Sequence, residues 1–90
     1  MNVYPKYVSV IDENNNIHKV LYKNIKEHEE FIIEDNIGYG LIHSEFSQKD
    51  IEAYRKQAYN ELKELKQRIR ENPDVILKLD TTSGRYIVVK

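Results

Sequence analysis

The sequence predicts an α+β domain in which a small, mostly antiparallel sheet packs against one long α-helix. Two β-rich hairpin patterns lie near the two ends of the 90-residue chain. A long amphipathic stretch that contains neither glycine nor proline lies between them. A chain of this length is enough for one hydrophobic core, so we expect residues 1–90 to form a single domain.

The first hairpin is predicted from residues 6–12 and 16–22, which read KYVSVID and NIHKVLY. Both runs are rich in β-branched side chains, and the second alternates as a half-buried strand does. Glu13, Asn14 and Asn15 separate them, and such residues tolerate turn conformations. Pro5 cannot donate a ladder hydrogen bond, so the first strand is expected at a sheet edge or to begin after this proline.

Residues 24–45 carry conflicting signals. Asn24 followed three positions later by Glu27 is typical of a helix N-terminus, whereas the FII triplet within residues 24–35 favours a strand. We expect a short helical turn that leads into a strand over residues 37–45, with Asp35 and Asn36 forming the turn before it. The predicted order of elements is therefore β-β-(α/β)-β-α-β-β.

The long helix is predicted between Ser47 and Asn72. Ser47 and Asp50 form an N-terminal capping pattern, and Pro73 ends the run. Its apolar side chains fall within an arc of roughly 80° when residues are projected at about 100° each. These are Ile51, Tyr54, Ala58, Leu62, Leu65 and Ile69.

The length of this helix has a consequence for packing. About 25 helical residues span roughly 37 Å, whereas a compact domain of this size is only about 30 Å across. We therefore expect part of the helix to overhang the sheet. Leu65 and Ile69, in its C-terminal half, would then need a cover from the last hairpin or from a second molecule.

A second hairpin is predicted after the helix, from residues 74–80 and 85–90, which read DVILKLD and RYIVVK. The TTSG loop between them ends at Gly84, which can adopt a positive φ.

The composition excludes several classes of function. The chain has no cysteine, which excludes disulfides, thiolate metal sites and cysteine nucleophiles. Its net charge of -1 gives no overall attraction to nucleic acid or to an anionic membrane. The sequence has no signal-peptide pattern and no apolar run of the roughly 20 residues that a membrane span needs. We expect a cytoplasmic protein that does not bind membranes.

Gly38 and Gly40 would share one face of the predicted strand and leave it without side chains. We expect the long helix or an aromatic ring to pack there. A phosphate-binding loop is not indicated, because such a loop leads directly into a helix N-terminus.

Candidate catalytic residues are few. His43 and Glu45 would lie on one strand face, and a second H-x-E pair occurs at His28 and Glu30. Neither pair has the cysteines of a zinc deaminase or the HExxH pattern of a metalloprotease. Ser44 and Ser83 are not in a nucleophile elbow. The sequence predicts no catalytic site, no metal and no cofactor.

The charges of the predicted long helix are segregated on the two sides of its apolar stripe. The basic flank comprises Arg55, Lys56, Tyr59, Lys63, Lys66 and Arg70, with Glu52 as the exception. The acidic flank comprises Asp50, Glu61, Glu64 and Glu71, with Arg68 as the exception. Two favourable i,i+4 pairs are predicted, Glu52 with Lys56 and Glu64 with Arg68. Solubility alone would not require this segregation.

We therefore interpret the chain as a small non-enzymatic protein-interaction module, of an accessory, regulatory or inhibitor type such as phages and mobile elements encode. It would bind a protein partner, or itself as a homodimer, through the charge-segregated helix. The seven tyrosines are consistent with contact surfaces. One alternative is a nucleic-acid-binding protein that uses the basic flank, and another is a small enzyme or metal protein centred on His43 and Glu45.

Overall fold

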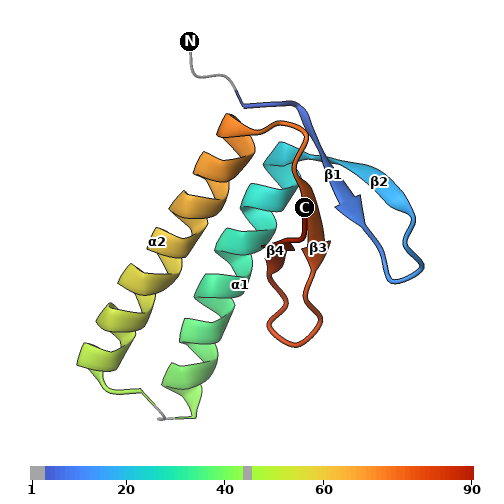
Figure 1. Ribbon diagram of the computed structural model, residues 1–90. Helices are drawn as coiled ribbons and strands as arrows, with labels where there is room; N and C mark the ends of the chain where they lie inside the picture. The colour runs from blue at the N-terminus through green and yellow to red at the C-terminus, as the bar shows by residue number, and fades with distance from the viewer. Residues whose placement is uncertain (1–3, 44–45) are drawn as a thin grey trace.

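The computed structural model describes residues 4–43 and 46–90, which form a four-stranded sheet and two long helices (Figure 1). The elements, in chain order, are β1 (Tyr7–Ile11), β2 (Ile17–Leu21), α1 (Tyr22–Ile42), α2 (Gln48–Glu71), β3 (Ile76–Leu79) and β4 (Tyr86–Val88). The predicted α+β class, with a long helix packed on the sheet, is confirmed.

The sheet is built from the two predicted hairpins. Its strand order is β2-β1-β3-β4, with β1 antiparallel to β2 and β3 antiparallel to β4. The hairpins are joined by a parallel pairing of β1 and β3, in which Val10 lies opposite Leu77. Asn15 and Gly84 supply the positive φ angles that the two turns need, 63° and 75°.

The helix α2 follows the sequence prediction. The Ser47 side chain accepts a hydrogen bond from the Asp50 backbone, and the Asp50 side chain accepts one from the Ser47 backbone. This capping box satisfies two amides that a helix N-terminus otherwise leaves unpaired. The helix ends at Glu71, shortly before Pro73.

The strand predicted over residues 37–45 is wrong, because this segment continues the helix α1 to Ile42. Residues 44–45 lie outside the described residues. The predicted turn at Asp35 and Asn36 is helical, and α1 begins at Tyr22, ahead of the predicted cap at Asn24. The physical reason is tertiary: every third or fourth side chain is buried, which gives the helix a continuous inner face despite its β-branched residues. These buried residues are Ile25, Glu29, Ile33, Ile37 and Gly40.

The interior consists of two apolar clusters. The first joins the sheet to the helices and contains Val8, Ile25, Leu65, Ile69, Val75 and Leu77. The second contains no strand residue and joins the two helices alone, through Ile33, Ile37, Ile51, Ala58 and Leu62. The overhang is therefore real, and Leu65 and Ile69 are covered by the last hairpin, as one of the two predicted alternatives had it, together with β1 and α1. The N-terminal half of α2 projects beyond the sheet, and α1 rather than a hairpin or a second molecule covers it (Figure 1).

The two helical glycines do not share a face, since residues two apart on a helix point about 200° away from each other. A Cβ at Gly38 would meet no atom within 4 Å, whereas a Cβ at Gly40 would overlap the Phe46 ring. The predicted close approach of an aromatic ring is thus present at Gly40 alone.

Candidate functional site

The basic flank of α2 is partly occupied by the chain itself. An Arg55 guanidinium nitrogen lies 3.1 Å from a carboxylate oxygen of Glu34 in α1. The Tyr59 hydroxyl donates to the other oxygen of Glu34 at 3.3 Å. Burial, followed by the Glu34 charge, raises the pKa of Tyr59. These two predicted partner-binding residues therefore hold the helices together.

The rest of the basic flank is divided. Lys56 and Lys63 are exposed, and among residues 4–43 and 46–90 they have no carboxylate within 4 Å. Lys66 is half-buried, and Arg70 is half-buried and donates to the Gln67 side chain at 2.6 Å. The predicted i,i+4 ion pairs of α2 do not form within 4 Å in the described part of the chain. The flank is not one continuous free surface.

The acidic flank also has partners in the same chain. Glu61 lies 3.7 Å from the Arg85 guanidinium, and Asp50 belongs to the capping box. The apolar stripe between the two flanks is covered by α1 and by the sheet. An antiparallel pairing of α2 with a second copy would have to displace these contacts.

The histidines are placed differently from the prediction. His43 is the C-terminal cap of α1, with its ring 4.1 Å from the Tyr39 ring, and Glu45 lies outside the described residues. The His28 ring donates to the Gly84 carbonyl at 2.7 Å, while Glu30 lies 3.7 Å from Lys26. Within the described ranges, no three His, Cys, Asp or Glu side chains are placed to hold a metal ion.

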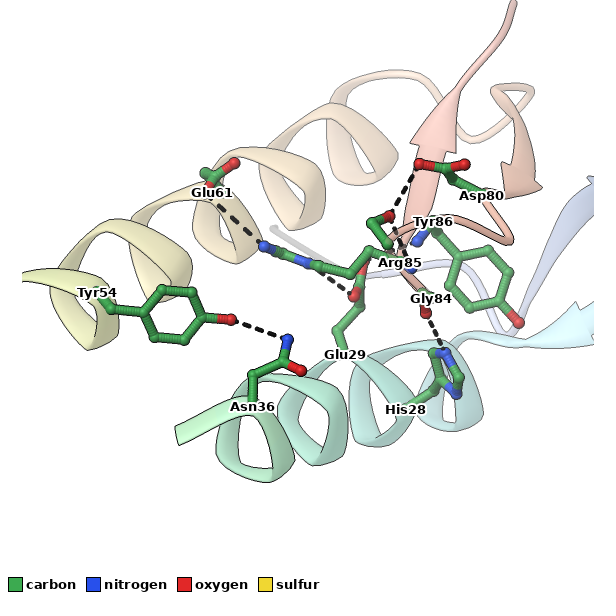
Figure 2. A network of polar contacts seen from close by, with 10 residues as sticks. His28, Glu29, Asn36, Tyr54, Glu61, Asp80, Gly84, Arg85 and Tyr86 are labelled. Carbon is green, nitrogen blue, oxygen red and sulfur yellow. Dashed lines mark hydrogen bonds and ion pairs between the residues drawn. The ribbon is translucent and has the colours of Figure 1, made fainter. Parts of the chain in front are cut away.

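A polar cluster around a buried carboxylate, which the sequence did not predict, joins both helices to the β3–β4 loop (Figure 2). Glu29 in α1 is only 1% exposed. One of its carboxylate oxygens accepts from the Arg85 Nε at 3.2 Å, and the other accepts from the Tyr86 backbone amide at 3.1 Å. Arg85 also faces Glu61, so its charge lies between two carboxylates. We call these residues, Glu29, Glu61, Arg85 and Tyr86, the Glu29 cluster.

The Glu29 cluster borders a cleft of about 380 Å³, whose other lining side chains include Glu64, Arg68 and Ser83. Both oxygens of Glu29 are already bonded within the protein, and Ser83 donates to Asp80 at 3.0 Å. A buried carboxylate needs such partners to offset its loss of hydration. The arrangement fixes the β3–β4 loop against the helices and leaves neither oxygen of Glu29 without a partner.

A second unpredicted feature is the sheet face that points away from the helices. Val8, Val20 and Leu77 point towards the helices, so the residues that alternate with them point the other way. Strand register, extended by one residue beyond β4, places seven apolar side chains on this outer face: Tyr7, Ile11, Ile17, Leu21, Ile76, Ile87 and Val89. We call this surface the open sheet face.

Four of these side chains are well exposed to solvent. Tyr7 is 48% exposed, Ile17 56%, and Ile87 and Val89 are each 46% exposed. Both helices lie on the opposite side of the sheet (Figure 1). None of the described elements covers the open sheet face.

The polar residues of the open sheet face are not acidic. The same registers place Ser9, Lys19 and Lys78 there, and none of the paired strand residues on this face is acidic. Lys19 donates to the Ser9 hydroxyl at 2.9 Å. At the edge, the Lys6 ammonium lies 5.7 Å from the centre of the Tyr7 ring. The face is therefore apolar and positively charged.

The outer side of α1 carries a smaller set of exposed apolar side chains. Phe31, Tyr39 and Ile42 are exposed there, with Gly38 bare among them. The exposed carboxylates of Glu34 and Asp35 interrupt this set. It is less continuous than the open sheet face.

Comparison of the chain with protein-family models, with curated proteins and with solved structures found no match. In the described part of the chain, neither helix combines the length and the apolar character that crossing a membrane requires.

Proposed function

We propose that this chain is a small, non-enzymatic protein-interaction module and that the open sheet face is its main binding surface. The observation that carries the proposal is the set of seven apolar side chains on a sheet face that no described element covers. Exposed apolar patches of this kind are typical of interaction sites. Lys56 and Lys63, the free part of the basic flank that the sequence predicted to bind a partner, lie on α2 outside the open sheet face, and the proposal does not depend on them.

The size of the face supports a specific but moderate interaction. Four strands about 4.8 Å apart, with up to five residues at about 3.3 Å each, give a plan area of roughly 300 Å². Covering this area contributes about 7 kcal/mol at roughly 25 cal/mol per Å². Association costs about 4–15 kcal/mol. Apolar contact alone therefore gives weak binding, and other contacts must set affinity and specificity.

The alternatives have less support. A site centred on His43 and Glu45 assumed a strand, and His43 instead ends a helix. Nucleic-acid binding relied on Tyr59 as an aromatic contact beside the basic side chains, and Tyr59 is hydrogen-bonded to Glu34.

The proposal can be tested by comparing two double variants. Ile17→Thr with Ile87→Thr reduces the apolar area at both edges of the open sheet face and keeps β-branched residues in the strands. Lys56→Glu with Lys63→Glu changes the free part of the basic flank. The partner is first captured from cells of the source organism by the immobilised wild-type chain. It is then purified, and its dissociation constant is measured for the wild type and for each variant.

We expect the isoleucine variant to bind the partner at least tenfold more weakly, which corresponds to about 1.4 kcal/mol. The lysine variant should bind within a few-fold of the wild type. Thermal unfolding monitored by circular dichroism shows whether each variant is folded. Unchanged affinity in a folded isoleucine variant would refute the proposal.

A further inference from the structure

We infer that the open sheet face binds an amphipathic α-helix whose polar side carries carboxylates. This inference rests on the proposed function and specifies the kind of partner. It is based on the architecture of the sheet, on the charges of the face and on its area.

The architecture indicates a layer that is missing from one side of the sheet. The sheet is mixed, with β1 and β3 paired in parallel at its centre, and in all-parallel sheets both faces are covered and the strands are near-continuously apolar. The sequences of β1 and β3, YVSVI and ILKL, are apolar at most positions on both faces. Helices already cover one face, through Ile25, Leu65 and Ile69. A helix laid on the opposite face would complete a layered α/β/α arrangement.

The charges of the face select the type of helix. Lys19 lies in the same cross-strand row as Ser9, and Lys78 lies between Ile11 and Ile87. The two ammonium groups therefore stand among the apolar side chains, and Lys6 stands at the edge. Neither Lys19 nor Lys78 has a carboxylate oxygen within 4 Å in the described part of the chain. A helix with glutamates beside its apolar stripe would place opposite charges there, whereas a helix with lysines would be repelled.

A second copy of the chain is a poorer occupant. Two open sheet faces packed together would each carry Lys19 and Lys78 and no acidic residue among the paired strand positions, so neither copy would offer these lysines an opposite charge there. A face of roughly 300 Å² is also well below the roughly 800 Å² that each partner buries in a standard interface. A helix that extends beyond the sheet can add contacts that a second flat face cannot.

The test uses two designed peptides of about 18 residues, each with a fluorescein label and the same leucine stripe at helical spacing. One carries glutamates beside the stripe and the other carries lysines. Fluorescence anisotropy gives the affinity of each peptide for the full chain at low and moderate salt. We expect the glutamate peptide to bind at least tenfold more tightly than the lysine peptide. Amide chemical-shift changes should map to the strands around Tyr7, Ile17 and Ile87.

Charge reversal provides the matched control. Lys19→Glu with Lys78→Glu should reverse the preference between the peptides, and Lys78→Glu alone should reduce it. Lys56→Glu with Lys63→Glu makes the same change in net charge on α2 and should leave the preference intact. Equal binding of both peptides to the wild type would overturn the inference. A preference that the Lys19 and Lys78 changes do not alter would overturn it as well.

Two other occupants are tested in parallel. Vesicles of phosphatidylserine and phosphatidylcholine report membrane binding, and sedimentation equilibrium reports self-association. If neither peptide binds, and membrane binding or self-association occurs but is abolished by Ile17→Thr with Ile87→Thr, the acidic helix is not the occupant.

The remaining outcomes separate this inference from the proposed function. If the peptides show no preference but those two isoleucine changes still weaken binding of the natural partner, the inference fails and the proposed function stands. If the isoleucine changes leave the natural partner's affinity unchanged, the proposed function itself fails.

Discussion

Removal of Arg85 should destabilise the fold more than any substitution of its exposed neighbours. Arg85→Met keeps a long side chain but leaves the Glu29 carboxylate, 1% exposed, with the Tyr86 amide as its remaining partner. Removing one member of a buried ion pair costs about 3–5 kcal/mol. A domain of this size has a total stability of roughly 5–13 kcal/mol, so the loss is a large fraction of the total. The expected decrease in Tm is at least about 12 °C.

A second substitution should restore part of this loss. Glu29→Gln removes the buried charge but keeps an oxygen that can accept from the Tyr86 amide. The Glu29→Gln, Arg85→Met double variant should therefore be about 2 kcal/mol more stable than Arg85→Met alone. Glu61→Gln serves as the control: Glu61 is 53% exposed and 3.7 Å from Arg85, so its loss should cost less than about 1 kcal/mol.

Urea denaturation at pH 7, monitored by circular dichroism, measures these differences in the free energy of unfolding. The reasoning predicts a specific order of stability, with Arg85→Met below the double variant. If the double variant is no more stable than Arg85→Met, the buried Glu29 charge is not what makes the arginine necessary.

Four further substitutions test local features. Gly38→Ala should stabilise the protein by about 0.5–1 kcal/mol, because a methyl group there meets no atom within 4 Å. Gly40→Ala should destabilise it by about 1 kcal/mol or more, since the methyl group would overlap an aromatic ring, and urea denaturation distinguishes the two. Ser47→Ala removes the side-chain cap of α2 and should lower the free energy of unfolding by about 1 kcal/mol in the same assay. The hydrogen bond from the His18 ring is the main cause that lowers the pKa of Asp12 below its ordinary value of 3.8. The bond therefore contributes its full stability above the ordinary pKa of Asp12 and loses it as the pH falls through the lowered pKa. Asp12→Asn should remove this loss and flatten the acid side of a plot of Tm against pH.

The elements that local sequence determines could be predicted. Ser47, Asp50 and Pro73 mark the ends of α2 by capping and by the exclusion of proline, and both contributions act within a few residues. The hairpins are likewise determined by alternation and by turn residues such as Asn15 and Gly84.

The helix α1 could not be predicted in the same way, because distant residues stabilise it. Its inner face includes Glu29, and a glutamate in that position looks like a break in an apolar stripe. Arg85, which makes the buried carboxylate tolerable, lies 56 residues away in the sequence. The four-residue spacing of Ile25, Glu29, Ile33 and Ile37 was the available signal for a helix.

The prediction of the binding surface from the sequence was incomplete for a related reason. Projecting α2 on its own shows which side chains share a flank but not which element covers that flank. Glu34, which binds both Arg55 and Tyr59, comes from the helix that was not predicted in full. The strands of the sheet are apolar on both faces, so their alternation alone could not show which face the helices would leave open.

The parallel pairing of β1 and β3 has a consequence for how the chain is made. Both helices lie between these strands in the sequence, so the N-terminal hairpin leaves the ribosome long before its central neighbour exists. Until β3 is synthesised, the inner edge of β1 carries unpaired backbone groups that can join another chain. The two helices bring the hairpins together, and their association should therefore limit the rate at which the sheet is completed.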